Sequence, residues 1–495
     1  MAETIGRDGA LPAGLSEDPA AAFGARGGVS GIRDLKAGAF GPTNKEVEMG
    51  SEPTQTLKAD VVIAGSGPGG ATVARDLSRK GKKVILCEAG KYHRWFGHTL
   101  STVRMLERMG LTFSTEGTWV FAAKTAGGGS VIFGGLAFKP PLGLREKWGV
   151  DLREEVEQVF REVPIRPLPD SHIGPGARKI MEAARDLGLD WKPNDRFIRP
   201  DKCKPDCAGC MLGCKEGAKW TAREYVEEAL QNGAKLLLQT KVDRVLVESG
   251  AAVGVRAKGP GGWLDVLAET VVVSAGGLGT PPILQRSGLH QAGDALVVDP
   301  GLLVLGPSNS QAPRYEVPAA CGAELAEEGI LLVDAVPTPL LYALLLSFSG
   351  ARGWLSMPKV LRTRRSLGIL VMTRDRMIGR VNPDKSFSKP IDPESRGKLD
   401  KGAALAEEIL QKAGVKRGDV VKTGVWSAHP ASTVRVGGLL DRNCQTPIKG
   451  CYCMDASVLP GEWGLPPMVT IVAMAKRLSK HLTAPIEARA TLRTP

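Results

Sequence analysis

The stretch from Asp60 to Gly90 constrains the fold more than any other part of the chain. An apolar run ends in Gly65-x-Gly67-x-x-Gly70, a helical stretch follows, and a second apolar run ends in Glu88. This order predicts a strand–helix–strand unit that holds a dinucleotide at the N-terminus of its helix. Gly65 permits the tight turn, Gly67 lets a pyrophosphate approach the backbone, and Gly70 lets the helix pack on the strand. Glu88 would accept hydrogen bonds from a ribose diol.

Composition limits the partners of the chain. The formal net charge of +12 favours anionic partners, such as a phosphate-bearing cofactor, an anionic lipid or an acidic carrier protein. Nucleic acid is not expected, because aromatic residues make up only 5% of the chain and neither zinc-finger spacing nor an aromatic platform on a basic strand occurs.

Targeting signals and cysteines indicate the compartment. The N-terminus has no apolar signal region, and no run of about 18 apolar residues occurs. Nine cysteines, four of them clustered, then favour reduced thiols. We expect a cytoplasmic protein, with peripheral contact at the inner face of the membrane as an alternative location, and the natural start at Met49.

The four clustered cysteines leave three interpretations open. Cys203, Cys207, Cys210 and Cys214 are spaced C-x3-C-x2-C-x3-C, and four thiolates in one loop can converge on a 4Fe-4S cluster. A zinc ion fits the same set. Alternatively, the thiols are packed and inert. A cluster would carry electrons one at a time.

An apolar segment between residues 337 and 350 also allows three structural interpretations. The run from Leu340 to Phe348 is apolar on all sides, and five basic residues follow it closely. It is too short to span a bilayer. It could lie in a membrane interface, cover an apolar substrate channel, or form a core helix.

Four ordered blocks of the chain together resemble the glucose-methanol-choline (GMC) oxidoreductases, flavoproteins that oxidise alcohols. The blocks are the dinucleotide unit, Gly127-Gly128-Gly129-Ser130, the stretch from Ala275 and Gly276 through Thr280 and Pro281 to Gly288, and Asp455-Ala456-Ser457 with Pro460. The helix after Pro467 resembles one whose N-terminus faces the flavin. The cysteine pattern and Lys139-Pro140 are most similar to the long-chain fatty alcohol oxidase branch.

The resemblance implies FAD and an α/β (α+β) fold. A Rossmann-like FAD-binding domain is expected together with a discontinuous substrate domain built on an antiparallel sheet. The expected segments are a flexible leader (1–56), the FAD-binding domain (57–300) with a cysteine-rich loop insertion (195–220), the substrate domain (301–435) and a C-terminal return to the FAD-binding domain (436–495). The expected FAD-binding residues are Gly65, Gly67, Gly70, Glu88, Gly128, Gly129, Ser130, Val242, Ala275, Gly276, Asp455 and Pro467.

The resemblance also assigns a catalytic base. His429 begins a His-x-x-x-Thr stretch similar to the family's active-site histidine pattern. An imidazole suits the step, because it can accept the hydroxyl proton at neutral pH while hydride leaves the carbinol carbon. Two positions depart from the family: Phe133 stands where an asparagine is usual, and Pro466 replaces the second active-site side chain. Both make the site less polar.

The sequence therefore predicts an FAD-dependent enzyme that oxidises an apolar, long-chain or alicyclic alcohol. We expect it to pass electrons to a carrier protein or a quinone rather than to O2. Two alternatives remain: an FAD and iron–sulfur oxidoreductase acting on a non-alcohol substrate, and a peripheral electron-transfer subunit that needs a partner.

Overall fold

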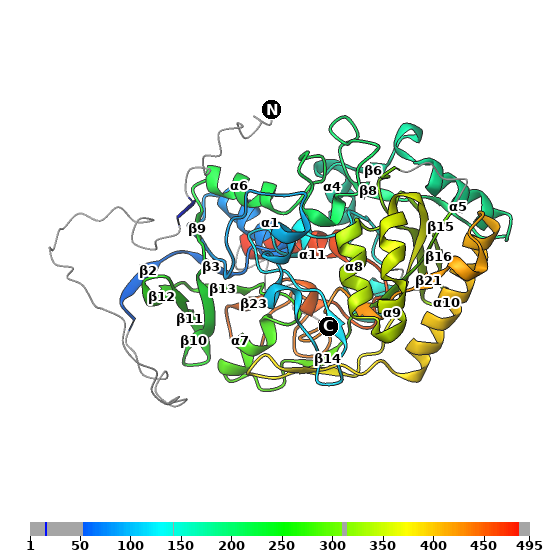
Figure 1. Cartoon of the computed structure of the whole chain (residues 1–495). Coiled ribbons are helices and arrows are strands. Elements are labelled where there is room, and N and C mark those ends of the chain that lie inside the picture. Colours follow the sequence, from blue (N-terminus) through cyan, green and yellow to red (C-terminus); the bar gives the residue numbers. More distant parts are fainter. Residues whose placement is uncertain (1–14, 17–52, 142, 309–313, 485–495) are drawn as a thin grey trace, which may run out of the picture.

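The computed structural model describes residues 15–16, 53–141, 143–308 and 314–484 (Figure 1). Most of the expected leader, including Met49, lies outside the described residues, as does the stretch after residue 484. Strand β2 (Gln55–Lys58) begins within the last two residues of that leader.

A parallel sheet forms the base of the dinucleotide unit. Within the described residues it has six strands in the order β1–β9–β4–β3–β13–β23, and every neighbouring pair is parallel. The strands are β1 (Leu15–Ser16), β3 (Val61–Ala64), β4 (Val84–Cys87), β9 (Lys235–Leu237), β13 (Thr270–Val273) and β23 (Cys451–Cys453). β3, β4 and β13 are runs of apolar residues because both faces of the sheet are covered.

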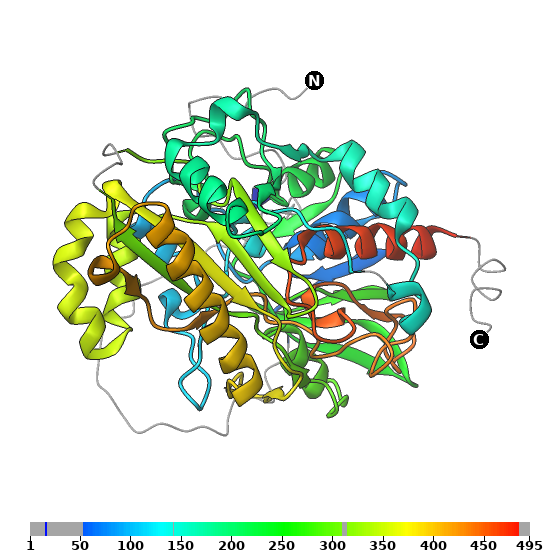
Figure 2. The ribbon, with the colours of Figure 1, turned by 90° about the vertical axis from the view of Figure 1, so that its right-hand side faces the viewer.

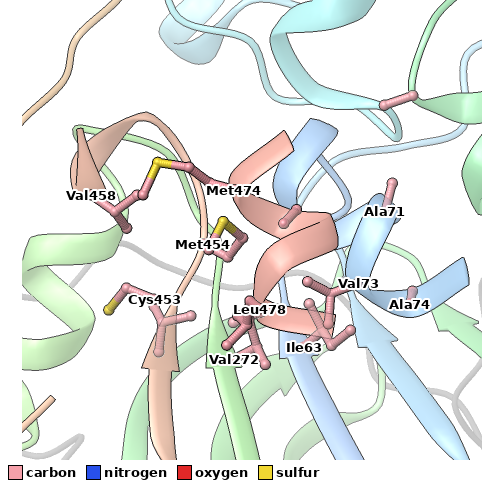
Figure 3. Close-up of a cluster of buried hydrophobic side chains, with 14 of the residues drawn as sticks. Ile63, Ala71, Val73, Ala74, Val272, Cys453, Met454, Val458, Met474 and Leu478 are labelled. Carbon is pink, nitrogen blue, oxygen red and sulfur yellow. The ribbon is translucent and has the colours of Figure 1, made fainter. Parts of the chain in front are cut away.

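Two helices cover one face of this sheet. Figure 3 shows Ile63 and Val272 of the sheet beneath Val73 of α1 (Pro68–Ser78) and Leu478 of α11 (Met468–Thr483). The other face is covered by a second sheet, in the order β10–β11–β12–β2, whose strand β11 contacts β13. Its bounds are β10 (Lys241–Glu248), β11 (Ala251–Gly259) and β12 (Gly262–Leu267).

A mainly antiparallel sheet forms the other half of the molecule. Its order is β5–β22–β15–β18–β17–β16–β7, with β21 beside β15. The strands are β5 (Trp119–Val120), β7 (Lys192–Pro193), β15 (Pro300–Pro307), β16 (Cys321–Leu325), β17 (Ile330–Asp334), β18 (Ser366–Thr373), β21 (Val421–Lys422) and β22 (Trp426–Ser427). The α/β class with an antiparallel second sheet is therefore confirmed. β5 and β7 come from before residue 301, so this sheet draws on more of the chain than the segment 301–435.

Helices pack on both faces of the antiparallel sheet, because side chains along a strand alternate between faces. Leu302 and Val304 of β15 pack with α10 (Pro393–Lys412), whereas Leu303 and Leu305 pack with α8 (Pro339–Ser347). In Figure 2, α8 and α9 (Gly350–Ser356) form one edge of the molecule, far from α11.

The remaining elements connect these layers. The helices are α2 (Thr99–Val103), α3 (Leu144–Trp148), α4 (Arg153–Glu162), α5 (Pro175–Arg185), α6 (Arg223–Gln231) and α7 (Thr280–Arg286). The strands are β6 (Ile165–Pro167), β8 (Asp195–Phe197), β14 (Asp294–Leu296), β19 (Gly379–Val381) and β20 (Phe387–Ser388). β6 pairs with β8, and β14, β19 and β20 form a small sheet.

Candidate functional site

A cavity of about 450 Å³ lies between the two halves of the molecule. Its lining brings together most of the residues that the sequence singles out. These are Gly65, Gly67, Glu88, Gly128, Gly129, Val242, Ala275, Gly276, His429, Asp455 and Pro467. Gly70 and Ser130 do not line the cavity, and both support residues that do.

The turn between β3 and α1 has no room for larger residues. Gly65 has φ +106°, and a Cβ there would lie 2.1 Å from the carbonyl oxygen of Ser274. A Cβ on Gly70 would lie 2.1 Å from the carbonyl oxygen of Gly65. Gly67 is the N-cap of α1 and supplies no side-chain cap, so the N–H groups of the first turn have no side-chain partner there. Such a helix terminus favours a phosphate.

Glu88 lies at the end of β4 with its carboxylate tied to the same turn. Oε2 accepts hydrogen bonds from the backbone N–H (3.0 Å) and the hydroxyl (2.7 Å) of Ser66, and Oε1 accepts one from the N–H of Gly90 (2.7 Å). Burial raises the pKa of Glu88, and these hydrogen bonds oppose that shift. The carboxylate is therefore held in a fixed position at the cavity wall.

The glycine turn packs directly against the dinucleotide turn. A Cβ on Gly128, which has φ +55°, would lie 2.8 Å from the Cα of Gly67, whereas a Cβ on Gly129 would meet nothing within 4 Å. The Ser130 hydroxyl donates to the carbonyl of Gly127 (2.6 Å) and accepts from the N–H of Ala222 (2.9 Å). Ser130 thus braces the turn, while Gly129 leaves space in the cavity.

Asp455 joins two further parts of the cavity wall. Its Oδ2 accepts hydrogen bonds from the N–H of Gly276 (2.8 Å) and the hydroxyl of Thr280 (2.6 Å). Burial raises the pKa of Asp455, and the hydrogen bonds from Ser457 and Thr280 oppose that shift. Pro467 is the N-cap of α11, again without a side-chain cap, so a second helix N-terminus meets the cavity.

These features fit FAD. Two helix N-termini without side-chain caps reach one cavity, glycines stand where a larger side chain would clash with backbone or occupy the space, and Glu88 stands at the end of β4. A long dinucleotide with an anionic centre matches this shape and charge. FAD, once bound, supplies the hydride acceptor.

His429 pairs with a buried aspartate that the sequence did not reveal. Its Nδ1 lies 3.1 Å from Oδ2 of Asp299, and Oδ1 of Asp299 accepts a hydrogen bond from the N–H of Gly464 at 3.1 Å. Burial raises the pKa of Asp299, and the hydrogen bond with His429 opposes that shift. The one sequence signal for Asp299 is an acid that ends an apolar run just before a proline.

Apolar side chains make up much of the lining of the cavity that His429 shares. Both residues that depart from the family pattern, Phe133 and Pro466, line it. Further apolar lining residues are Leu341, Leu344, Leu370, Met372, Phe387 and Trp426. The cavity therefore has room for an apolar molecule as well as for polar groups.

The cysteine loop borders the cavity, but it does not form a metal site in the structure. Across the described parts of the chain, no group of three or more His, Cys, Asp or Glu residues is placed to hold a metal ion. The prediction that Cys203, Cys207, Cys210 and Cys214 hold a cluster or a zinc ion thus has no support from this arrangement. Cys203 and Cys210 pack against the core, and burial raises the pKa of both thiols.

Lys219 is the residue that attaches this loop to the site. Its ammonium donates hydrogen bonds to the carbonyls of Val131 (2.9 Å), Phe133 (2.7 Å) and Cys210 (2.7 Å). Burial lowers the pKa of Lys219 to about 8. The cation ties the cysteine loop to the segment that follows the glycine turn.

Known proteins that resemble this chain are oxidoreductases of the GMC type. Residues 100–301 match the family model described as GMC oxidoreductase. An uncharacterized GMC-type oxidoreductase of Mycobacterium tuberculosis is 26% identical over 89% of this chain and 78% of its own length. A long-chain-alcohol oxidase of Arabidopsis thaliana is 25% identical over 86% of this chain and 67% of its own length. The chain therefore carries a GMC oxidoreductase domain, and the resemblance indicated by the motifs is confirmed.

Solved structures agree on the fold. A pyridoxine 4-oxidase from Mesorbium loti superposes with a TM-score of 0.63 at 17% identity, covering 85% of this chain and 98% of that protein. A formate oxidase from Aspergillus oryzae superposes with a TM-score of 0.61 at 14% identity, covering 86% of this chain and 98% of that protein. These likenesses show the fold that the chain shares with the two oxidases.

Proposed function

We propose that the protein oxidises an apolar, long-chain or alicyclic alcohol by hydride transfer to FAD, with His429 as the base. The observation that carries this proposal is the His429–Asp299 pair, whose histidine lines the same cavity as the residues that fit FAD. Apolar side chains surround the remaining space. Relatives named long-chain-alcohol oxidases support the same substrate class.

The proton step follows from the geometry of the pair. Asp299 accepts the Nδ1–H of His429, which leaves Nε2 as the basic nitrogen. Nε2 takes the hydroxyl proton of the alcohol as the hydride leaves its carbinol carbon. The carboxylate of Asp299 then stabilises the imidazolium that forms. Phe133 and Pro466 offer the substrate no hydrogen bond, so the hydroxyl is held mainly by His429.

Anaerobic stopped flow tests this proposal. Dodecanol should bleach the flavin absorbance of the holoenzyme, and ethanol should do so far more slowly. His429→Asn should retain FAD but lower the rate of flavin reduction by at least about a hundredfold, as expected for loss of a general base. The exposed His290 provides the matched control, since His290→Asn should leave the rate unchanged. Near-normal reduction in His429→Asn would remove the assignment.

The same experiment separates the other functions. Bleaching of the isolated chain by an alcohol excludes the electron-transfer subunit. Bleaching only by substrates that lack a carbinol favours an oxidoreductase acting on another group.

Reoxidation of the reduced enzyme should be faster with a soluble quinone than with air, since we propose a quinone or a carrier protein as the acceptor. Equal rates would contradict that choice.

A further inference from the structure

An exposed apolar surface lies beside the entrance of the cavity. One part is the segment 339–365, which comprises α8, α9 and the 3₁₀ segment Met357–Arg365. In this segment the side chains of Trp354, Leu355 and Leu361 are 63%, 82% and 92% exposed. Large apolar side chains that water surrounds to this extent mark a contact surface when they cluster.

A second part of the surface comes from residues 95–111. Trp95, Leu100, Met109 and Leu111 of this segment are all exposed. The two segments approach each other where Phe113, just after the second segment, packs on Phe348 at the end of α8, with ring centroids 5.8 Å apart. We call these two segments together the apolar rim. Figure 1 shows α8 and α9 on the near side of the molecule.

The apolar rim borders the cavity. Leu341 and Leu344 of α8 line the cavity, and so do Thr99, Val103 and Leu106 of the second segment. Arg108 both lines the cavity and is exposed, so the cavity reaches the surface within the rim. An apolar molecule entering there would pass between the two segments.

The charge of the rim indicates what covers it. From residue 335 to residue 373 the chain contains no Asp or Glu, whereas Arg352, Lys359, Arg362, Arg364 and Arg365 all fall within it. Exposed apolar side chains flanked by such cations fit the interface of an anionic bilayer. No helix in the described residues is long and apolar enough to cross a membrane, so the contact would be peripheral.

We propose that the apolar rim docks on an anionic lipid bilayer and opens the cavity toward the lipid. Trp354, Leu355 and Leu361 would insert among the headgroups, and the arginines would approach the lipid phosphates. An apolar alcohol dissolved in the bilayer would then reach His429 without crossing water. This delivery rests on the proposed function, whereas the docking does not.

Vesicle sedimentation of the holoenzyme tests the docking without substrate. We expect binding to vesicles of phosphatidylglycerol and phosphatidylcholine, and little binding to phosphatidylcholine alone. The triple variant Trp354→Ser, Leu355→Ser, Leu361→Ser should weaken partitioning by at least about tenfold, because three apolar side chains no longer insert. Val247→Ser, at an exposed apolar residue of β10, is the matched control and should change nothing.

The basic residues of the apolar rim allow a second, independent test of vesicle binding. Arg352→Gln with Arg365→Gln should weaken binding by about tenfold, while Lys58→Gln with Lys80→Gln, on the FAD-binding half, should not. None of these variants should alter flavin reduction by a soluble alcohol. Equal vesicle binding by the triple variant and the wild type would overturn the proposal. So would a dimer that the triple variant dissociates, with no vesicle binding by the wild type, since the rim would then join two copies.

Discussion

In the proposed function, Asp299 sets which nitrogen of His429 acts as the base. The carboxylate is buried and also accepts the N–H of Gly464, so its position is fixed from two sides. A carboxylate in this position favours the tautomer with hydrogen on Nδ1. Asp299 is not among the residues that line the cavity, so it would act through His429 and is a positioning residue. Its effect should appear in kinetics rather than in FAD content.

Asp299→Asn tests that role. The variant keeps the size of the side chain but removes the negative charge beside the imidazole. We expect kcat to fall at least about tenfold, since loss of the orienting carboxylate costs more than that in comparable pairs. The rate of flavin reduction should fall while the FAD content stays that of the wild type. A variant that loses FAD together with its activity would show structural damage only.

At the scale of elements, the loop that carries His429 depends on a glycine from the FAD-binding half. His429 itself has φ +53°, an uncommon conformation for a non-glycine residue. A Cβ on Gly277 would lie 2.0 Å from the carbonyl oxygen of Pro430, and the Thr433 hydroxyl donates to the Gly277 carbonyl at 2.9 Å. Gly277 thus lets the two segments touch.

Gly277→Ala should displace the loop. The added methyl group would meet backbone, which cannot rotate away, so Pro430 and His429 must shift. We expect flavin reduction to slow by more than about tenfold, as small misplacements of a catalytic group do, while absorbance shows FAD still bound. The control is Gly397→Ala in α10, where a Cβ would meet nothing within 4 Å. An unchanged rate in Gly277→Ala would show that the loop tolerates the shift.

For the whole molecule, the sequence predicts the parts that follow from local patterns. The strand–helix–strand unit, the glycine turn and the position of Asp455 are all encoded within short motifs. The Asp299–His429 contact joins residues 130 positions apart, and no motif contains both. Likewise, β5 and β7 are two-residue strands that are defined by pairing with β22 and β16, which lie far along the chain. Such elements depend on tertiary pairing, which periodicity does not report.

The run from Leu340 to Phe348 illustrates the same limit. Three interpretations remained open from the sequence, and the structure combines two of them. Tyr342, Leu345 and Leu346 are core residues, while Leu341 and Leu344 line the cavity. A helix that is apolar on all sides has no polar face to indicate its orientation. Only its neighbours determine which residues face the cavity.

A charged cluster joins four helices that lie far apart in the sequence. Oε2 of Glu162, at the end of α4, accepts hydrogen bonds from Arg75 of α1 and Lys476 of α11, both at 2.7 Å. Arg75 also bonds Glu228 of α6 at 2.7 Å. Both cations are buried, with side chains 5% and 1% exposed, so they need this partner. The cluster holds the helical layer over the parallel sheet.

In the Glu162→Gln variant, the free energy of unfolding should fall less as the pH is lowered than it does in the wild type. Burial raises the pKa of Glu162, but hydrogen bonds from Lys476, Gln158 and Arg75 outweigh it and lower the pKa from 4.5 to about 2. A lowered pKa in the folded state contributes stability above the unfolded value, and this contribution is lost as pH falls from 4.5 toward 2. At neutral pH, the variant should lose about 2 kcal/mol in free energy of unfolding, the size expected for hydrogen bonds to charged groups.

Denaturant unfolding of the holoenzyme at a series of pH values measures that contribution. The difference between wild type and Glu162→Gln should be largest near neutrality and shrink as the solution is acidified. Glu157 is the matched control on α4, because its side chain is 72% exposed and lies 3.7 Å from Arg161. Glu157→Gln should change the free energy of unfolding by less than about 1 kcal/mol. If the two variants behave alike, the buried cations Arg75 and Lys476 do not need Glu162, and the cluster does not hold the helices together.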